Sequence, residues 1–323
     1  MMSRKIAITG DILRPDINGK FSQEYNINWF YDLINEPLQQ IGIKPDKIGY
    51  DKFQTLEYYK AIEKPFNVFS WADIYNKPNK ALINIYRDYD YIIGFELPNC
   101  IKKALSNNGI TWIDFVISPI RFLESDVYLT CSSNNLDILK RLDFLFKKYV
   151  QTDFVKQIKS NVDRIKQSAQ KLFEENTGIF IGQTRYDRTL IDGNEFINLG
   201  ELFKSNLLRI QTEHEKMLYK PHPYQIDDIG IEITNENIYD ILSQDNVTIY
   251  GWNSSALYEA MQFNVEYDKL DDNEFYKDYY TFLHHYLLPH FWTYILSDTQ
   301  YQFPKISFEQ NKLRKIVGSW GHK

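Results

Sequence analysis

The sequence predicts an α/β fold made of two Rossmann-like domains, each built around a mainly parallel β-sheet. Its 323 residues are enough for two domains of ordinary size, each with its own hydrophobic core. In both halves, short apolar segments alternate with amphipathic ones, which is typical of strands followed by helices. A charged stretch without Pro or Gly separates the halves and predicts a helical connection.

The first half of the chain contains the patterns of three strands and two helices. The predicted strands cover residues 5–10, 91–97 and 110–117, with a further candidate at 66–71. One helix is predicted over 28–41, where Pro37 gives a kink or a break. The other follows Pro98, runs through Leu105 and ends at an Asn-Asn-Gly turn. We expect these elements to form an N-terminal Rossmann-like domain over residues 1–150.

The second half repeats the alternation. The pattern is helical from Leu136 to about Glu175, and we assign 151–176 to a helical linker and 177–323 to a C-terminal Rossmann-like domain that ends in helices. Strands are predicted at 178–183, 217–220 and 247–251, and helices at 195–216, 235–243, 254–262 and 275–296. Ligands of such sheets bind beyond the carboxyl ends of the strands, so we expect a ligand cleft between the two sheets.

Composition excludes several classes of protein. A net charge of −6 argues against a nucleic-acid-binding protein, which normally has a basic surface. Two cysteines exclude a disulfide scaffold and fit a reducing cytoplasm. No stretch reaches the roughly 18 apolar residues of a membrane span, and the apolar run 6–10 stops at Asp11, as in a mature cytoplasmic protein that starts with a strand. Aromatic residues make up 16% of the chain, and they can stack on bases and sugars or fill the cores.

Common catalytic and metal-binding motifs are missing from the sequence. It contains no G-x-G-x-x-G, Walker A, G-x-S-x-G or H-E-x-x-H motif. His284, His285 and His290 lack the further ligands of a zinc site, so we expect them to pack within an aromatic helix. Asp88 and Asp90 match a D-x-D metal motif, but they precede a predicted strand instead of following one. We therefore expect no metal site.

The first of three polar loops is Lys220-Pro221-His222-Pro223, directly after a predicted strand. Two prolines stiffen this turn, which places an ammonium group and an imidazole at the end of the sheet. Such groups bind phosphates and carboxylates. A rigid surface turn is the alternative.

The second loop leads into the helix that starts with Ser254 and Ser255. Free N–H groups and hydroxyls at a helix start bind anions. Glu259 lies one turn further on the same helical face, where it could accept hydrogen bonds from a ribose. Alternatively, Ser254 is a plain helix cap and Glu259 a solvated helix residue.

The third loop opens the second domain and contains Gln183 and Asp187. Asp187 follows a buried strand and lies between Arg185 and Arg188, which should keep its carboxylate ionised. A surface ion pair is the alternative.

Together, the loops resemble the bacterial capsule and lipopolysaccharide Kdo transferases. The matching pattern is Gln183-x-x-x-Asp187, then Lys220-Pro-His222-Pro, then Ser254-Ser255 with Glu259, all within residues 181–263. Residues 94–98 and 118–122 resemble the family less specifically. The His-Pro and Ser-Ser pairs are shared with bacterial sialyl- and polysialyltransferases and with CDP-glycerol transferases. The family often has acidic residues just before the aspartate, where this chain has Arg185 and Tyr186. This difference leaves the identity of the donor sugar more open than the fold.

The resemblance implies a GT-B-like fold, in which two Rossmann-like domains with parallel sheets face each other across a cleft. Residues 1–150 would be the acceptor-side domain and residues 177–323 the nucleotide-sugar-binding domain. It implies that Lys220 and His222 hold the donor phosphate or the sugar carboxylate. Ser254 and Ser255 would bind the CMP phosphate, Glu259 the ribose and Gln183 the donor. Asp187 would be the nucleophile of a retaining double displacement. Glu96, at the end of a first-domain strand, is the candidate acid/base for the acceptor hydroxyl, and a structural carboxylate is the alternative.

The sequence thus predicts a metal-independent glycosyltransferase that moves Kdo from a CMP-activated donor to a bacterial surface glycan or glycolipid. A transferase specific for CMP-sialic acid or a CDP-alditol is one alternative, and a non-catalytic glycan- or nucleotide-binding assembly protein is another. We expect a cytoplasmic protein that can visit the inner membrane peripherally. The basic and aromatic residues within 312–323 suit a membrane surface, although a helix packed on the first domain is favoured.

Overall fold

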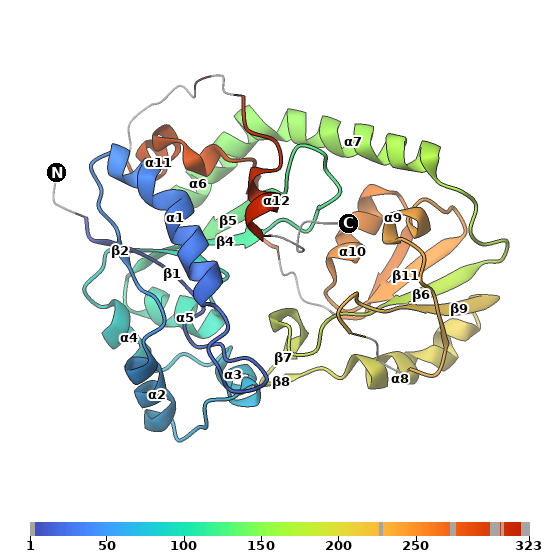
Figure 1. Ribbon diagram of the computed structural model, residues 1–323, viewed down its shortest axis with the longest axis horizontal. Helices are drawn as coiled ribbons and strands as arrows, with labels where there is room; N and C mark the ends of the chain where they lie inside the picture. Colours follow the sequence, from blue (N-terminus) through green and yellow to red (C-terminus); the bar gives the residue numbers. More distant parts are fainter. Residues whose placement is uncertain (1–3, 226–228, 272–275, 298–303, 305–306, 318–323) are drawn as a thin grey trace. The chain divides into compact units, whose positions relative to one another are not determined.

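The computed structural model describes residues 4–225, 229–271, 276–297, 304 and 307–317, and the statements below concern these residues (Figure 1). The chain forms two compact units. Unit 1 comprises residues 1–118, 125–152 and 278–323, and unit 2 comprises residues 119–124 and 153–277. Each unit contains its own β-sheet, as the predicted α/β fold with two Rossmann-like domains requires.

The sheet of unit 1 has six strands in the order β13-β5-β4-β3-β1-β2. Four of them are parallel, namely β1 (Ile6–Gly10), β2 (Asp46–Lys47), β3 (Tyr91–Phe95) and β4 (Thr111–Ile117). The other two, β5 (Leu129–Ser133) and β13 (Tyr280–Phe282), are antiparallel to their neighbours. The sheet is therefore mainly parallel, as predicted, with an antiparallel edge formed by β5 and β13. The short loop between β4 and β5 contains no crossover helix, which a parallel connection would need.

The helices of unit 1 pack around this sheet. They are α1 (Glu24–Gln40), α2 (Lys52–Ala61), α3 (Val68–Ile74), α4 (Lys80–Tyr86), α5 (Asn99–Asn107), α6 (Leu136–Leu145), α11 (Pro289–Leu296) and α12 (Lys312–Val317). The candidate strand at 66–71 is wrong, because the Asn67 side chain accepts the Ser70 N–H and starts α3. Pro37 lies within α1 and does not end it.

The last part of the chain belongs to unit 1, which corrects the predicted second domain of residues 177–323. Strand β13 pairs with β5 and forms one edge of the sheet, and α11 packs against α1 and α6. The single helix predicted over 275–296 is also wrong, since β13, the 3₁₀ turn His285–Leu287 and α11 form there.

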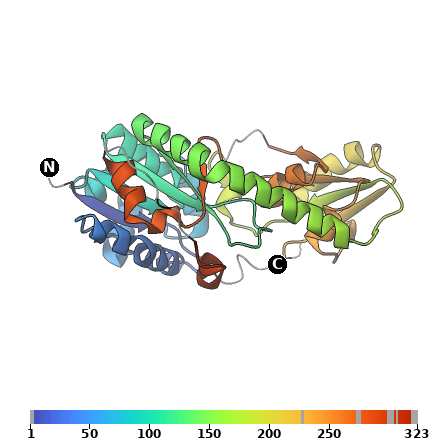
Figure 2. The same ribbon diagram turned by 90° about the horizontal axis from the view of Figure 1, so that it is seen from above.

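The predicted linker is helical over only part of its length. Helix α6, the π-helical turn Phe146–Val150 and α7 (Gln151–Ser168) follow one another without a break (Figure 2). The helix ends at Ser168, because the side chains of Gln244 and Asn246 bind backbone groups of residues 170–175. Residues from 153 onward belong to unit 2.

The sheet of unit 2 is entirely parallel and has the order β10-β9-β6-β11-β12. Its strands are β6 (Thr177–Ile181), β9 (Lys216–Lys220), β10 (Glu232–Ile233), β11 (Val247–Gly251) and β12 (Glu266–Lys269). Helices α8 (Leu199–Gln211), α9 (Ile238–Ile241) and α10 (Ser255–Gln262) connect them, and a small hairpin of β7 (Ile191–Asp192) and β8 (Glu195–Phe196) follows β6. Numbered along the chain, the strand order is 3-2-1-4-5, as in a Rossmann fold.

Buried side chains of unit 2 hold the sheet against α8. Phe180 stacks on Phe203 with the ring centroids 4.4 Å apart, and Tyr219 and Tyr250 belong to the same buried cluster. This core fixes the carboxyl ends of β9, β6 and β11, where the predicted loops begin.

Candidate functional site

The strand order of unit 2 places a topological switch point between β6 and β11. The chain leaves β6 toward β9 on one side and leaves β11 toward β12 on the other, so the loops after these strands diverge (Figure 1). In open α/β sheets, this divergence creates the ligand crevice. The three polar loops of the sequence follow β6, β9 and β11, so the structure brings all of them to one edge of the sheet.

The loops after β6 and β9 are in direct contact. The Gly182 N–H donates to the Lys220 carbonyl at 2.8 Å, and the Arg185 N–H donates to the Gln225 side chain at 2.7 Å. A Cβ atom on Gly182 would lie 2.4 Å from the Tyr219 hydroxyl and 3.0 Å from the His222 nitrogen. Glycine at position 182 therefore allows this close approach.

Gln183 is the first side chain beyond the close contact and is only 8% exposed. Its Nε2 donates to the Thr189 hydroxyl at 3.0 Å. Its Oε1 is buried and has no hydrogen-bond partner among the described residues. An acceptor of this kind calls for a ligand or a bound water.

Asp187 lies in the turn that follows Gln183. Its Oδ1 accepts hydrogen bonds from the Thr189 N–H at 2.8 Å and from the Thr189 hydroxyl at 2.7 Å. These bonds cap the 3₁₀ turn Arg188–Leu190, while Tyr186 before it has a left-handed backbone (φ 62°). The carboxylate is thus held at a fixed position while its residue is only half-buried.

His222 lies in a tight turn after β9. Its Nδ1 accepts the Tyr224 N–H at 3.3 Å, and its carbonyl accepts the Gln225 N–H at 2.9 Å. Lys220 is the last residue of β9, and both side chains are half-buried. Two hydrogen bonds join this turn to the loop after β6, one from the Gly182 N–H and one from the Arg185 N–H.

The loop after β11 contributes both a helix start and two unpaired polar atoms. Ser254 caps α10 by accepting the Ala256 N–H at 3.3 Å, and Ser255 is the first helical residue. The Trp252 Nε1 and the Asn253 Oδ1 are buried and lack partners among the described residues. The sequence-based prediction of this loop gave no role to Trp252 and Asn253. A polar and an aromatic residue directly after a strand at a switch point are a signal that could have indicated ligand contacts there.

Glu259 is buried inside unit 2, which rules out the solvated helix residue considered above. Its Oε1 accepts the Arg121 N–H at 2.8 Å and is 3.4 Å from the Tyr239 hydroxyl. Burial raises the pKa of this carboxyl to about 7, although hydrogen bonds from the 121–122 backbone oppose the shift. Glu259 thus attaches segment 119–124 to α10, and its contact with a ribose stays a prediction.

Glu96 belongs to unit 1 and directly follows β3. Its backbone is left-handed (φ 56°), a conformation that costs a non-glycine residue about 1–3 kcal/mol. The Glu96 N–H donates to the Phe115 carbonyl at 2.8 Å, and the next N–H, of Leu97, donates to the buried Asp114 carboxylate at 2.8 Å. Asp114 also binds the Lys102 ammonium group at 3.1 Å and the Tyr279 hydroxyl at 2.8 Å. This network holds the half-buried Glu96 at the strand end.

Asp90 of the D-x-D motif and His284 of the histidine cluster form contacts within unit 1. Asp90 accepts the Lys5 N–H at 2.8 Å at the start of β3. The buried His284 contacts the Asp126 carboxylate at 2.6 Å, within the core of unit 1. Among the residues that the structure describes, no group of three or more His, Cys, Asp or Glu side chains could hold a metal ion.

The basic C-terminal segment packs on unit 1. Asp126 accepts the Leu313 and Arg314 N–H groups at the start of α12, at 2.7 and 2.9 Å. Leu313 and Val317 are buried, and the Tyr25 hydroxyl donates to the Ile316 carbonyl at 2.6 Å. The favoured prediction of a packed helix is confirmed for 312–317, whereas 318–323 lie outside the described residues. No helix in the described ranges is both long and apolar enough to span a bilayer.

The two Rossmann-like units define a mixed α/β protein consistent with a two-domain GT-B-like fold. No family model and no curated protein matches the chain. One similar solved structure is the KpsC beta Kdo 2,7 transferase of Thermosulfurimonas dismutans, with a TM-score of 0.43 and 13% identity over 82% of this chain and 78% of that chain. Another is the KpsC beta Kdo 2,4 transferase of the same organism, with a TM-score of 0.36 and 13% identity over 55% and 68%. At these TM-scores, the functional interpretation depends on the loops of the chain itself.

Proposed function

We propose that this chain is a glycosyltransferase that binds a CMP-activated sugar at the switch point of unit 2, and that this sugar is Kdo. The acceptor would be a bacterial surface glycan or glycolipid. One observation carries the proposal. Three buried polar atoms without partners among the described residues, Gln183 Oε1, Trp252 Nε1 and Asn253 Oδ1, follow the two strands that flank the switch point.

These atoms favour a polar ligand over a purely structural loop. A buried polar atom without a partner typically costs about 1–3 kcal/mol, so a folded protein retains three of them at one edge only with compensation. A nucleotide sugar offers donors and acceptors that could complete these contacts. The register supports this arrangement, because Tyr250 pairs with Phe180 and positions 253 and 183 lie three residues beyond that pair.

A CMP-sugar carries a single phosphate, and the loops offer groups that match it. Lys220 and His222 can supply charge-assisted hydrogen bonds. The N-terminus of the eight-residue helix α10 adds N–H groups and the Ser255 hydroxyl. This set can neutralise one phosphate, so the proposal includes no metal ion.

Asp187 is the proposed nucleophile. Its carboxylate attacks the anomeric carbon, the bond from that carbon to the phosphate oxygen breaks, and CMP leaves with the electron pair. The acceptor hydroxyl then attacks the glycosyl ester and restores the carboxylate, and its proton passes to a base, for which Glu96 is the candidate. Two displacements retain the anomeric configuration.

The nucleotide site is tested by calorimetric titration with CMP. His222→Ala and Ser255→Ala should each weaken binding by about 1.5–3 kcal/mol, or roughly 10- to 150-fold, because each removes a hydrogen bond to a charged phosphate. Ser205→Ala, on the exposed side of α8, is the matched control and should bind CMP like the wild type. Unchanged affinity in both loop variants would show that the phosphate does not bind there.

The catalytic role is tested with Asp187→Asn. Asparagine caps a helical turn as well as aspartate, so the 3₁₀ turn should persist while the nucleophile is lost. We expect nearly unchanged donor binding and turnover lower by several orders of magnitude. Wild-type protein given donor and a poor acceptor should carry a sugar adduct on the Asp187 peptide, detected by mass spectrometry. Normal turnover of the variant would reject the role, and an inverted product would recast Asp187 as a general base.

A donor panel separates the alternatives. Release of CMP from CMP-Kdo supports the proposal, whereas preference for CMP-sialic acid or for a CDP-alditol supports the related transferases. Binding of a nucleotide without hydrolysis of any donor would indicate the non-catalytic binding protein.

A further inference from the structure

Asp114 is a buried carboxylate within a central strand of unit 1. Strand β4 lies between β3 and β5, and the Asp114 side chain is 0% exposed. Aspartate is disfavoured in strands, and burial of its charge is costly unless the carboxylate is paired and hydrogen-bonded. The reaction proposed above gives this residue no role. What the carboxylate binds therefore has to explain its presence there.

The carboxylate connects three separate parts of unit 1. Its Oδ1 accepts the Leu97 N–H at 2.8 Å, in the turn after β3. Its Oδ2 accepts the Lys102 ammonium group of α5 at 3.1 Å and the Tyr279 hydroxyl at 2.8 Å. Lys102 also donates to the Tyr279 hydroxyl at 3.2 Å, so the three side chains form one closed network. Tyr279 follows the point at which the chain enters unit 1 again, between residues 277 and 278.

The turn that this network holds has a strained backbone, because Glu96 has a left-handed conformation (φ 56°). Glu63 has the same conformation (φ 55°), but it directly follows the C-cap of α2, where a left-handed residue is common. Glu96 instead follows strand β3 directly. Strained residues of this kind cluster at functional sites, and Tyr186 (φ 62°), just before Asp187, is a second example in this chain.

Close packing reinforces the turn. Asp114 pairs with Gly94 in the register of β3 and β4, so it lies beside the strand residue two positions before Glu96. The Leu97 side chain is fully buried and folds back over Gly94, where a Cβ atom would lie 2.2 Å from the Leu97 Cγ. The Glu96 N–H donates to the Phe115 carbonyl at 2.8 Å. The N–H groups of residues 96 and 97 are thus both bonded to β4, which sets the direction in which the Glu96 side chain leaves the backbone.

We propose that Asp114 is a positioning residue for Glu96. Through the Leu97 N–H it holds the strained turn that directs the Glu96 carboxylate, and Lys102 and Tyr279 hold Asp114 in its turn. The proposal rests on the transferase reaction proposed above, with Glu96 as its base. A base works only within hydrogen-bond reach of the proton that it takes, so a small displacement of the turn lowers the rate although the base is still present.

Asp114→Asn separates this role from that of a simple backbone cap. Asparagine has one acceptor oxygen and one NH₂ group, whereas donors reach both oxygens of Asp114. In either orientation of the amide, its NH₂ group faces a donor, either the Leu97 N–H or the Lys102 ammonium group. The turn should therefore loosen while the shape of the side chain is preserved.

The assay uses the full chain with CMP-Kdo, and water takes the place of the acceptor. Asp187 first forms the glycosyl ester and releases CMP. Water then attacks the anomeric carbon, its proton passes to Glu96, and the Asp187 carboxylate is restored. Asp114→Asn should leave the first burst of CMP and the CMP affinity unchanged, because neither needs the base. Steady-state CMP release should fall about 10- to 100-fold, and more sugar adduct should remain on the Asp187 peptide.

A double-mutant cycle shows whether Asp114 acts through Glu96. In the Glu96→Gln background, Asp114→Asn should change the steady-state rate less than about twofold, because the group that it positions is missing. Equal losses in both backgrounds would overturn the proposal. Asp126→Asn is the matched control, since Asp126 is an equally buried carboxylate of unit 1 that accepts backbone N–H groups of α12. It should lower the temperature of unfolding and leave the rate within about twofold of the wild type.

Tyr279→Phe carries the same test if Asp114→Asn does not fold. It removes one hydroxyl from the network and should lower the steady-state rate about two- to fivefold, again only when Glu96 is present. In both variants, the amides of residues 96 and 97 should exchange hydrogen about tenfold faster than in the wild type, measured by mass spectrometry. Unchanged exchange would overturn the proposal.

The two proposals fail in different ways. A wild-type chain that hydrolyses no donor would refute the transferase and with it the positioning role. An active wild type whose rate is unaffected by Asp114→Asn and by Tyr279→Phe would refute the positioning role alone.

Discussion

Replacing Glu259 by Gln removes a carboxyl group whose pKa is raised by burial from 4.5 to about 7. The unfolded chain releases this proton near pH 4.5, whereas the folded protein keeps it up to about pH 7. Between these values the folded state binds more protons, so the free energy of unfolding falls as the pH rises. With about 1.4 kcal/mol for each pKa unit, the loss amounts to roughly 3 kcal/mol, fully expressed above pH 7.

Chemical denaturation of the wild type and Glu259→Gln at pH 5 and pH 8 measures this effect. The glutamine can still accept the Arg121 N–H, so the variant should have a stability near that of the wild type at pH 5. At pH 8 it should be the more stable protein, because it carries no buried charge. Glu236→Gln, at an exposed position of the same unit, should change with pH like the wild type. A parallel loss of stability in the wild type and Glu259→Gln would refute the reasoning.

Two further predictions concern the switch-point site. Gly182→Ala should lower the free energy of unfolding by about 1–3 kcal/mol and weaken CMP binding, because its Cβ would press on Tyr219 and on the His222 nitrogen. Thermal unfolding and titration with CMP measure these effects. Gly251→Ala is the control, because its Cβ would meet no atom nearer than 3.5 Å. Donor hydrolysis should continue in EDTA, because Lys220, His222 and the start of α10 can neutralise one phosphate. Activity that EDTA abolishes and Mg²⁺ restores would direct attention to Asp88 and Asp90.

The sheet of unit 2 and its loops could be predicted because the signals are local. Each of β6, β9 and β11 is a short apolar run, and polar residues follow it directly in the sequence. A parallel sheet then brings these residues to one edge without any knowledge of distant contacts. This reasoning placed Gln183, His222 and Ser254 at that edge, and their roles in donor binding stay predictions.

Long-range contacts determined what the sequence could not predict. Strand β13 pairs with β5 across about 150 residues, and nothing within 278–296 indicates that partner. The many aromatic residues of this segment also hide the difference between helical and strand periodicity. Asp126 likewise binds the start of α12, 187 residues away. The sequence favoured a last helix packed on the first domain, but the residue that holds it becomes visible only in the structure.

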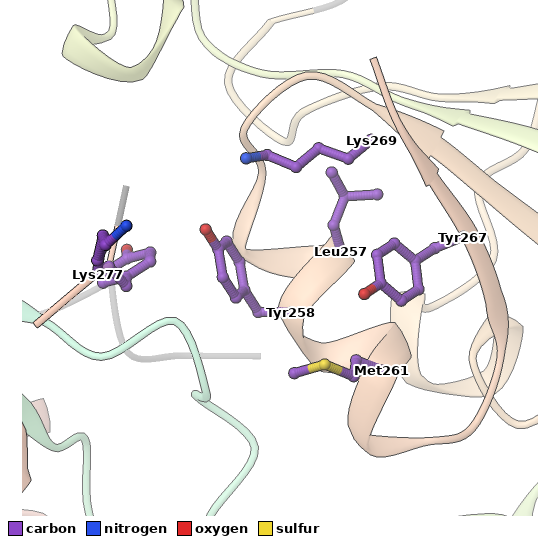
Figure 3. A pocket seen from close by; sticks show the side chains of 7 residues that line it. Leu257, Tyr258, Met261, Tyr267, Lys269 and Lys277 are labelled. Carbon is purple, nitrogen blue, oxygen red and sulfur yellow. The ribbon is translucent and has the colours of Figure 1, made fainter. Parts of the chain in front are cut away.

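Helix α10 shows how one short segment can serve three purposes. At about 100° per residue, Ser255 and Glu259 lie roughly 40° apart, whereas Tyr258 and Met261 lie on another side. The helix start offers the proposed phosphate site, and the buried side holds segment 119–124 through Glu259. On the third side, Tyr258 and Met261 line a pocket together with Tyr267 (Figure 3). Glu259 cannot turn toward a ribose without releasing the Arg121 N–H, so donor binding through Glu259 would be coupled to the conformation of segment 119–124.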